Sequence, residues 1–248
     1  MKDALEKICK NCEANTNSLF CENCGQKTTV DKITFKETLG DFFDTIFSVN
    51  APLLITIKLL VINPGKLFRE YLSGKRKTYY KPVAFFILIS IIYLLIRSLI
   101  NYNPFTSSTI QVSDETTRQL LSKAREFMLY NIDKFLFVFV FTLGLLLKFF
   151  FFRKRSFAEF IAISFYLLGF YTFITILNMF FIKFINNQIQ FLAILVANIY
   201  FTYAMVSFFQ KRKFLVAIKS LIVSFIAFFL YASTAFGISF LIIWFKYH

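Results

Sequence analysis

Residues 83–96 read VAFFILISIIYLLI and contain no charged side chain. Together with its flanks, this stretch predicts a helix over residues 79–101, long enough to cross about 30 Å of hydrocarbon. Tyr79 and Tyr80 at one end, and Tyr102 at the other, stand where aromatic side chains anchor a helix at a membrane interface. The sequence therefore predicts an integral membrane protein built from helices.

Four more apolar segments of similar length follow the first. They cover residues 133–152, 159–183, 189–209 and 215–244. The last is longer than one span needs but too short for two spans and a turn, so it is interpreted as one long or tilted helix. The expected fold class is an all-α integral membrane protein with about five transmembrane helices, bundled over residues 79–248.

The composition agrees with this class. Of the 248 residues, 57% are hydrophobic and 17% are charged, whereas soluble domains average about 45–50% and ~25%. With 37 Phe but only 7 Gly and 4 Pro, collagen-like, disordered and disulfide-scaffold classes are excluded. The single histidine, His248, is the last residue, which argues against a histidine-based catalytic centre inside the bundle.

The net charge of +14 is distributed unevenly over the connections between the spans. The connections rich in Lys and Arg are residues 1–82, 148–158 and 210–214. The poorer or charge-balanced ones are residues 101–134, 183–188 and the C-terminal tail. By the positive-inside rule, this alternation predicts a multi-pass protein of the cytoplasmic (inner) membrane, with its N-terminus in the cytoplasm and its C-terminus outside.

The region before the first span, residues 31–78, is predicted to form amphipathic and interfacial cytoplasmic helices. Apolar side chains within residues 34–47 recur on one helical face. The segment LLITIKLLVI, residues 53–62, is too short to span and carries Lys58 in its middle, so it is predicted to be interfacial or re-entrant.

A short helix is then predicted, with a signal at each end. Asn63 fits the N-cap, Pro64 the first helical position and Gly74 the position after the helix. A basic cluster lies in and after this helix, and we expect it to contact anionic lipid headgroups, at about 1 kcal/mol per cation. It consists of Arg69, Lys75, Arg76, Lys77 and Lys81. The alternative is that these cations only reflect the positive-inside bias.

All four cysteines lie in two C-x-x-C pairs, Cys9-Lys-Asn-Cys12 and Cys21-Glu-Asn-Cys24. Two such pairs can close a tetrahedral four-thiolate site, which predicts a zinc ribbon over residues 1–30. Two disulfides are the alternative, but the charge bias places this region in the cytosol, where disulfides are rare. A closed site leaves no position for substrate water, so the expected zinc is structural.

Residues 1–30 carry four Lys and four acidic residues, so their net charge is zero. Phosphate binding requires a basic surface, which argues against nucleic acid as a ligand. We expect the ribbon to dock a protein partner or to cap the cytoplasmic region.

At this point the chain resembles a known family. A ribbon ending in C-x-x-C-G-Q-K precedes the string P-G-K-x-x-R-E-Y-L-x-G-K-R-x-x-Y-x-x-P. Its defined positions here are Pro64, Gly65, Lys66, Arg69, Glu70, Tyr71, Leu72, Gly74, Lys75, Arg76, Tyr79 and Pro82. Together, ribbon and string resemble a bacterial family of zinc-ribbon integral membrane proteins described only as a domain of unknown function. The resemblance covers residues 9–90; it implies the architecture argued above and supplies no activity.

Polar side chains inside the spans are candidates for function. Asn178 on the third span, and Asn198 and Thr202 on the fourth, are expected at similar depth. They can form hydrogen bonds between helices, or they can line a polar groove for a solute or lipid. Glu159 at the start of the third span is expected to form an i,i+4 ion pair with Arg155.

These features favour a membrane-anchored interaction or regulatory protein. The alternative is a small transporter or lipid-handling membrane protein. An enzyme is disfavoured because the only interfacial acids, Asp41, Asp44, Glu70 and Glu159, lack a histidine, nucleophile or metal partner. The expected partners are a bilayer with anionic headgroups and a protein bound through the ribbon, and a homo-oligomer is compatible with each interpretation.

Overall fold

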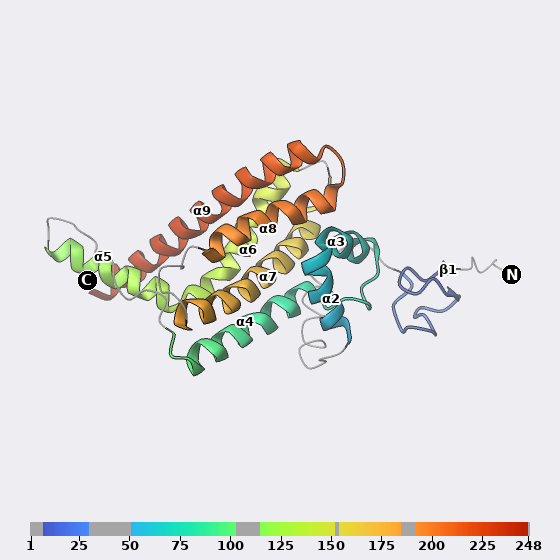
Figure 1. Ribbon diagram of the computed structural model, residues 1–248, viewed down its shortest axis with the longest axis horizontal. Coiled ribbons are helices and arrows are strands. Elements are labelled where there is room, and N and C mark those ends of the chain that lie inside the picture. Colours follow the sequence, from blue (N-terminus) through green and yellow to red (C-terminus); the bar gives the residue numbers. More distant parts are fainter. Residues whose placement is uncertain (1–6, 30–50, 103–114, 152–153, 185–191, 248) are drawn as a thin grey trace.

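The computed structural model describes residues 7–29, 51–102, 115–151, 154–184 and 192–247. They form a helical bundle with a small two-stranded unit beyond one end (Figure 1). The predicted amphipathic helix over residues 34–47 lies outside the described residues.

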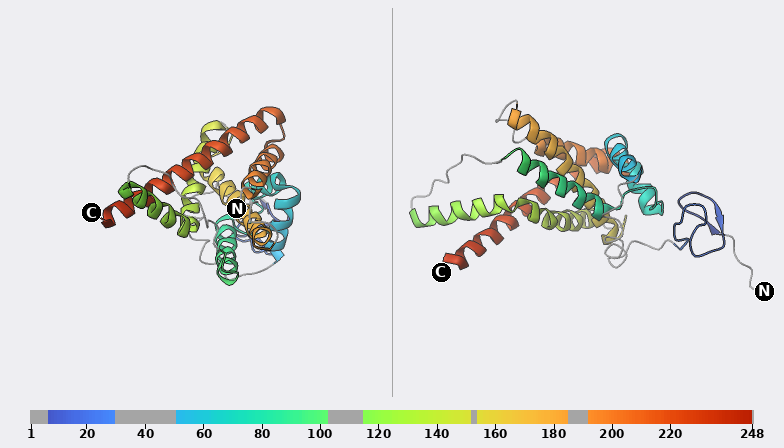
Figure 2. Two further views of the ribbon diagram at one scale, coloured as in Figure 1. Left: turned by 60° about the vertical axis from the view of Figure 1, so that its left-hand side comes forward. Right: turned by 90° about the horizontal axis from the view of Figure 1, so that it is seen from below.

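The two-stranded unit contains β1 (Lys7–Ile8) and β2 (Asn15–Thr16), which pair antiparallel. A single bridge between Phe20 and Lys27 closes its second half. Figures 1 and 2 place this unit beyond the α2–α3 end of the bundle, opposite the C-terminus.

Two short helices follow, α2 (Ala51–Ile62) and α3 (Pro64–Ser73). The predicted signals around α3 are confirmed. The Asn63 side chain accepts a hydrogen bond from the backbone N–H of Lys66, Pro64 occupies the first helical position, and Gly74 ends the helix with a φ of 121°. Whether α2 is interfacial or re-entrant stays a prediction.

Within the described residues, four helices are long and apolar enough to cross a membrane: α4 (Pro82–Leu99), α7 (Phe157–Phe184), α8 (Leu192–Phe209) and α9 (Lys213–Tyr247). The last is one continuous helix of 35 residues, as predicted. The chain is thus an all-α protein with the character of a membrane protein.

The second predicted span, residues 133–152, forms α6 (Ile132–Phe150). This helix of 19 residues is not among the four, and it carries Lys134 near its beginning and Lys148 near its end. The count of five spans therefore stays a prediction.

The helix α7 is the centre of the bundle and packs against α4, α6 and α8. In its most apolar stretch 72% of the residues are buried, against 28–33% in the other three apolar helices. The outward faces of those helices carry exposed apolar side chains, among them Leu95, Leu99, Ile199 and Phe229. Such a surface is stable in lipid and a liability in water.

Residues 101–134 are predicted from the sequence to be a charge-balanced connection between spans, and the structure corrects this. Residues Glu115–Tyr130 form α5, which packs against α9. The reason is an apolar stripe at i, i+4 spacing, Leu120, Ala124 and Met128, in which Ala124 is fully buried.

The buried ring of Tyr166 joins the short helices to the bundle. Its hydroxyl donates to the backbone oxygen of Tyr80, and its ring contacts Phe68 and Tyr71 of α3 and Phe85 of α4. A buried aromatic cluster of this kind fixes the position of α3 and of the loop after it.

Candidate metal centre

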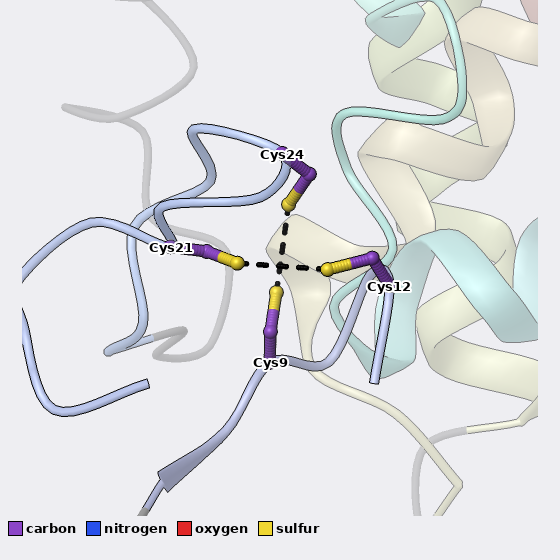
Figure 3. Close-up of side chains that lie close together, drawn as sticks. All are labelled: Cys9, Cys12, Cys21 and Cys24. Carbon is purple, nitrogen blue, oxygen red and sulfur yellow. Dashed lines mark hydrogen bonds between the residues drawn. The ribbon is translucent and has the colours of Figure 1, made fainter. Parts of the chain in front are cut away.

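The four cysteine side chains converge on one point. Figure 3 shows their sulfurs pointing toward a common centre, and all four lie within 4.8 Å of one another. Two Sγ–Sγ distances are 3.6 Å (Cys9–Cys24) and 3.5 Å (Cys12–Cys21). A disulfide requires about 2.05 Å, whereas a tetrahedral zinc ion with Zn–S distances of about 2.3 Å separates its sulfurs by about 3.8 Å. The arrangement is compatible with a metal site.

The two halves of the site have the same backbone geometry, offset by twelve residues. The N–H of Cys9 donates to the oxygen of Ala14 at 2.9 Å, and that of Cys21 to the oxygen of Gln26 at 2.7 Å. Glu13 and Gly25, at equivalent positions, have φ angles of 63° and 66°. Gly25 adopts this φ without strain because it has no Cβ, whereas Glu13 adopts the same turn despite its side chain.

The thiols differ in their surroundings. Cys9 and Cys21 are buried, whereas Cys12 and Cys24 are half-buried. The backbone at Ala14 lowers the pKa of Cys12 to about 7, and burial raises the pKa of Cys24 to about 11. A divalent cation at the centre would hold all four as thiolates, because a coordinating thiol is deprotonated.

The two-stranded unit that carries the four cysteines is attached to the loop between α3 and α4 through Gln26, a contact that sequence reasoning missed. The Gln26 side chain is only 5% exposed. Its Nε2 donates to the oxygen of Gly74 at 2.6 Å, and its Oε1 accepts from the backbone N–H groups of Arg76 and Lys77 at 3.2 Å each. The signal in the sequence is the Gln that directly follows Gly25, after the second C-x-x-C pair. Each C-x-x-C pair with the turn after it is called a knuckle here.

Two further contacts support this attachment. Thr78 donates its hydroxyl hydrogen to Asn11 Oδ1, from the first knuckle. Lys75 lies 4.0 Å from the exposed Glu13 carboxylate, a surface pair of small energetic value. Both knuckles thus contact residues 74–78, the loop that leads into α4.

The predicted headgroup cluster does not form one surface, because Arg69 turns into the protein. Its Nη1 donates to the backbone oxygens of Ser207 and Phe208, at the C-terminal end of α8. Burial lowers the pKa of Arg69. Lys75, Arg76, Lys77 and Lys81 lie together on the loop before α4, and their contact with lipid stays a prediction.

A second set of contacts fixes α2 to α8. The Tyr200 hydroxyl donates to the oxygen of Leu60 at 2.9 Å, and the Tyr203 hydroxyl donates to that of Ile62. The last carbonyls of α2 are therefore satisfied by side chains of α8, while those of α8 are satisfied by Arg69 of α3. These bonds hold the short helices to the bundle.

The intramembrane polar residues bond mainly within their own helices. Asn198 Nδ2 donates to the oxygen of Ile194 at 2.8 Å, and Thr202 Oγ1 donates to the oxygen of Asn198 at 3.0 Å. The Oδ1 atoms of Asn178 and Asn198 are buried and have no hydrogen-bond partner in the described part of the chain. These two oxygens therefore do not join α7 to α8.

The predicted ion pair at the start of α7 is confirmed, with Arg155 Nη1 at 3.2 Å from Glu159 Oε1. Sequence reasoning missed the capping box around it. The N–H of Ser156 donates to Glu159 Oε2 at 2.7 Å, and the N–H of Glu159 donates to Ser156 Oγ at 3.2 Å. The pattern S-x-x-E before an apolar run is the signal that could have found it.

Residues 52–94 match a family model described as "Protein of unknown function (DUF3667)". The match covers α2 from its second residue, α3, the loop that holds Gln26 and most of α4. It supports similarity to a family of unknown function over this part of the chain. No curated protein and no solved structure matches the chain.

Proposed function

We propose that this protein is a membrane-anchored interaction or regulatory protein, in which a structural zinc ribbon is attached to the membrane-proximal loop 74–78. The observation that carries the proposal is the closed four-thiol cluster outside the bundle, attached to that loop through Gln26. All four sulfurs face inward, so an ion there has no free position for catalysis.

We place the ribbon and the basic loop on the cytoplasmic side of the inner membrane, with five spans and the C-terminus outside. The alternation of charged connections supports this orientation. Lys75, Lys77 and Lys81 precede α4, the position at which a cytoplasmic segment meets anionic headgroups. A reporter fused to either terminus and assayed on both sides of the membrane tests the topology.

The ribbon also has side chains suited to a protein partner. Ile8, Leu19 and Phe20 are 65%, 69% and 59% exposed. Large apolar side chains that remain exposed on a small, rigid unit are typical anchors of a protein interface. We therefore assign the partner contact to Leu19 and Phe20, which adjoin the metal ligand Cys21.

The experiment is a quantitative cross-linking pull-down from native membranes with four versions of the chain. They are the wild type, Cys21→Ser/Cys24→Ser, Leu19→Ser/Phe20→Ser, and the control Asn17→Ala/Asn23→Ala at exposed polar positions. Membrane insertion and zinc content are measured for each. We expect one partner to be lost in both the cysteine variant and the Leu19/Phe20 variant, although the latter keeps its zinc. The control should retain that partner.

The same partners in all four samples would contradict the interaction role of the ribbon. Loss with the cysteine variant alone would place the contact on another surface that depends on the metal. Absence of zinc from the purified wild type would contradict the structural zinc site.

A further inference from the structure

The bundle contains a cavity at the end away from the ribbon, here called the distal cavity. Its volume is about 330 Å³, within the range of about 300–1,000 Å³ typical of ligand sites. The helices α4 to α9, together with Tyr102 just after α4, line it; at this end α5 lies beside the last part of α9 (Figure 1). It lies outside the metal centre and the loop contacts described above.

The wall of the distal cavity is mostly apolar. Representative lining residues are Met128, Ile132, Leu136, Met179, Ile182 and Ala235. A wall of flexible Met and branched aliphatic side chains suits a hydrocarbon chain better than a polar solute.

Asn178 is a polar member of this wall, which also includes Arg125, Thr172 and Thr175. Its side chain is only 7% exposed, and its Oδ1 has no hydrogen-bond partner in the described residues. A buried acceptor without a partner is costly, and nearly all such groups in native proteins are satisfied. An amide oxygen can only accept, so the missing partner must be a donor such as a hydroxyl or an N–H.

A second unpartnered acceptor belongs to Asn198. Asn198 lines a smaller cavity that shares Tyr171, Ile194 and Phe228 with the distal cavity. Each of these two cavities thus has one lining Asn whose buried side-chain oxygen is unpartnered in the described residues.

A polar pocket adjoins the distal cavity at Tyr102, which lines both. Arg97 from the last turn of α4 and Lys134 from the first turn of α6 also line this pocket. In the described residues neither forms an ion pair with a carboxylate, and Lys134 Nζ instead donates to Asn131 Oδ1 at 2.8 Å. Two cations that line one pocket favour an anion.

We propose that the distal cavity binds an anionic single-chain amphiphile that carries a hydrogen-bond donor beside its head. The acyl chain occupies the apolar wall, an amide N–H or hydroxyl donates to Asn178 Oδ1, and the anionic head faces Arg97 and Lys134. An ester at the same place lacks the donor and leaves Asn178 unsatisfied. The site is independent of the ribbon and of the function proposed for it.

The test compares two probes that differ in one group, with purified full-length protein in detergent micelles. N-palmitoylglycine carries an amide N–H, and palmitoyl glycolate carries an ester oxygen at the same position. Native mass spectrometry with titration gives the dissociation constants. We expect the wild type to bind the amide about tenfold more tightly than the ester, as one satisfied buried acceptor implies.

Three variants separate the contribution of the Asn178 acceptor to binding from that of the two cations. Asn178→Leu should bind both probes equally, because the acceptor is gone. Arg97→Gln/Lys134→Gln should weaken both probes by a similar factor and keep the preference for the amide. Thr234→Val, on an exposed position of α9 outside the cavity lining, is the control and should behave as the wild type.

Equal affinities in the wild type, or an amide preference that persists in Asn178→Leu, would overturn the proposal. A photoreactive diazirine in the acyl chain provides a measurement that does not depend on the folding of a variant. We expect it to label Met128, Leu136 or Met179 in the wild type. Labelling confined to outward residues such as Leu95 and Phe229 would show binding to the lipid-facing surface instead and would equally overturn the proposal.

Discussion

The side-chain amide of Gln26 donates a hydrogen bond to the backbone oxygen of Gly74, 48 residues further along the chain. Its carbonyl oxygen accepts from Arg76 and Lys77 in the same loop. Gln26 follows the second knuckle by two residues, so the fold around the thiols positions its side chain. We therefore expect the state of the four-thiol site to influence the order of the loop before α4.

Replacing Gln26 by Ala should loosen this loop while the metal stays bound. The change leaves the oxygen of Gly74 and the N–H groups of Arg76 and Lys77 without their partner. Losing such contacts costs about 1–3 kcal/mol, so opening of the loop should become at least about tenfold more frequent. Trypsin cleavage after Arg76 and Lys77 in purified protein measures this directly.

The matched control is Asn23→Ala, at an exposed position of the same knuckle. It should keep the wild-type cleavage rate and zinc content. If Gln26→Ala also kept the wild-type rate, the ribbon would not order the loop.

Removing the metal should have the same effect on the loop by another route. Because metal binding and folding are coupled in small four-thiol sites, a chelator should unfold the knuckles and release Gln26. We expect one zinc ion per chain before treatment and fast tryptic cleavage at Arg76 and Lys77 after it. Readdition of zinc should restore protection; protection that persists in the metal-free protein would contradict the coupling.

Local chemistry made the four-cysteine cluster and the short helix α3 predictable. The thiols come in two tight pairs, and the signals at Asn63, Pro64 and Gly74 act within one helical turn. The contacts that assemble these parts were not predictable, because they join distant segments. Arg69 reaches Ser207 across 138 residues, and nothing in its neighbourhood distinguishes it from the other cations of the cluster.

The helices of the bundle were found by hydropathy, which reports how apolar a segment is but not what it faces. For this reason α5 was missed, since its polar side chains dominate its composition while Leu120, Ala124 and Met128 supply a narrow apolar stripe. Likewise, the sequence places Asn178 and Asn198 at similar depth, but it does not tell that both residues line cavities or that their Oδ1 atoms have no hydrogen-bond partner in the described residues.

The close approach of α3 to α8 depends on Gly65. A Cβ at this position would overlap the backbone of Ser207 and Phe208, which cannot move aside as a flexible side chain would. Gly65→Ala should therefore destabilise the protein by about 1–3 kcal/mol or more. Gly237→Ala on α9 is the matched control, because a Cβ there meets nothing within 4 Å, and it should be neutral or stabilising by up to about 1 kcal/mol. Thermal unfolding in detergent measures both; equal effects would contradict the close contact.

The phenol of Tyr79, before α4, donates to Glu70 on α3 and is buried. Tyr79→Phe should cost about 1.5–3 kcal/mol, the range for hydrogen bonds to charged groups. Burial and Glu70 also raise the pKa of Tyr79 above its usual 10. Above pH 10 the unfolded state releases a proton that the folded state retains, so wild-type stability should fall as the pH rises from about 10.

In Tyr79→Phe this fall should be shallower, because one of the groups responsible is missing. The exposed Tyr130→Phe serves as the control and should leave both stability and its pH dependence near the wild type. Chemical unfolding at pH 7, 9, 10 and 11 makes the comparison. The same slope in Tyr79→Phe and wild type above pH 10 would contradict the assignment.

A substitution of Arg69 distinguishes a structural role of this side chain from a role in binding lipid headgroups. If it satisfies the last carbonyls of α8, then Arg69→Gln should lower the stability of the bundle by about 1–3 kcal/mol, because Ser207 and Phe208 lose a charged donor. If Arg69 instead binds lipid headgroups, the variant should keep its stability and lose affinity for anionic headgroups. We expect the first result, with cosedimentation on phosphatidylglycerol vesicles unchanged. Lys66→Gln, on the exposed side of the same helix, is the control, since its 3.9 Å pair with Glu70 is a weak surface contact. An Arg69→Gln protein with wild-type stability and reduced vesicle binding would contradict the structural role and support headgroup binding by Arg69.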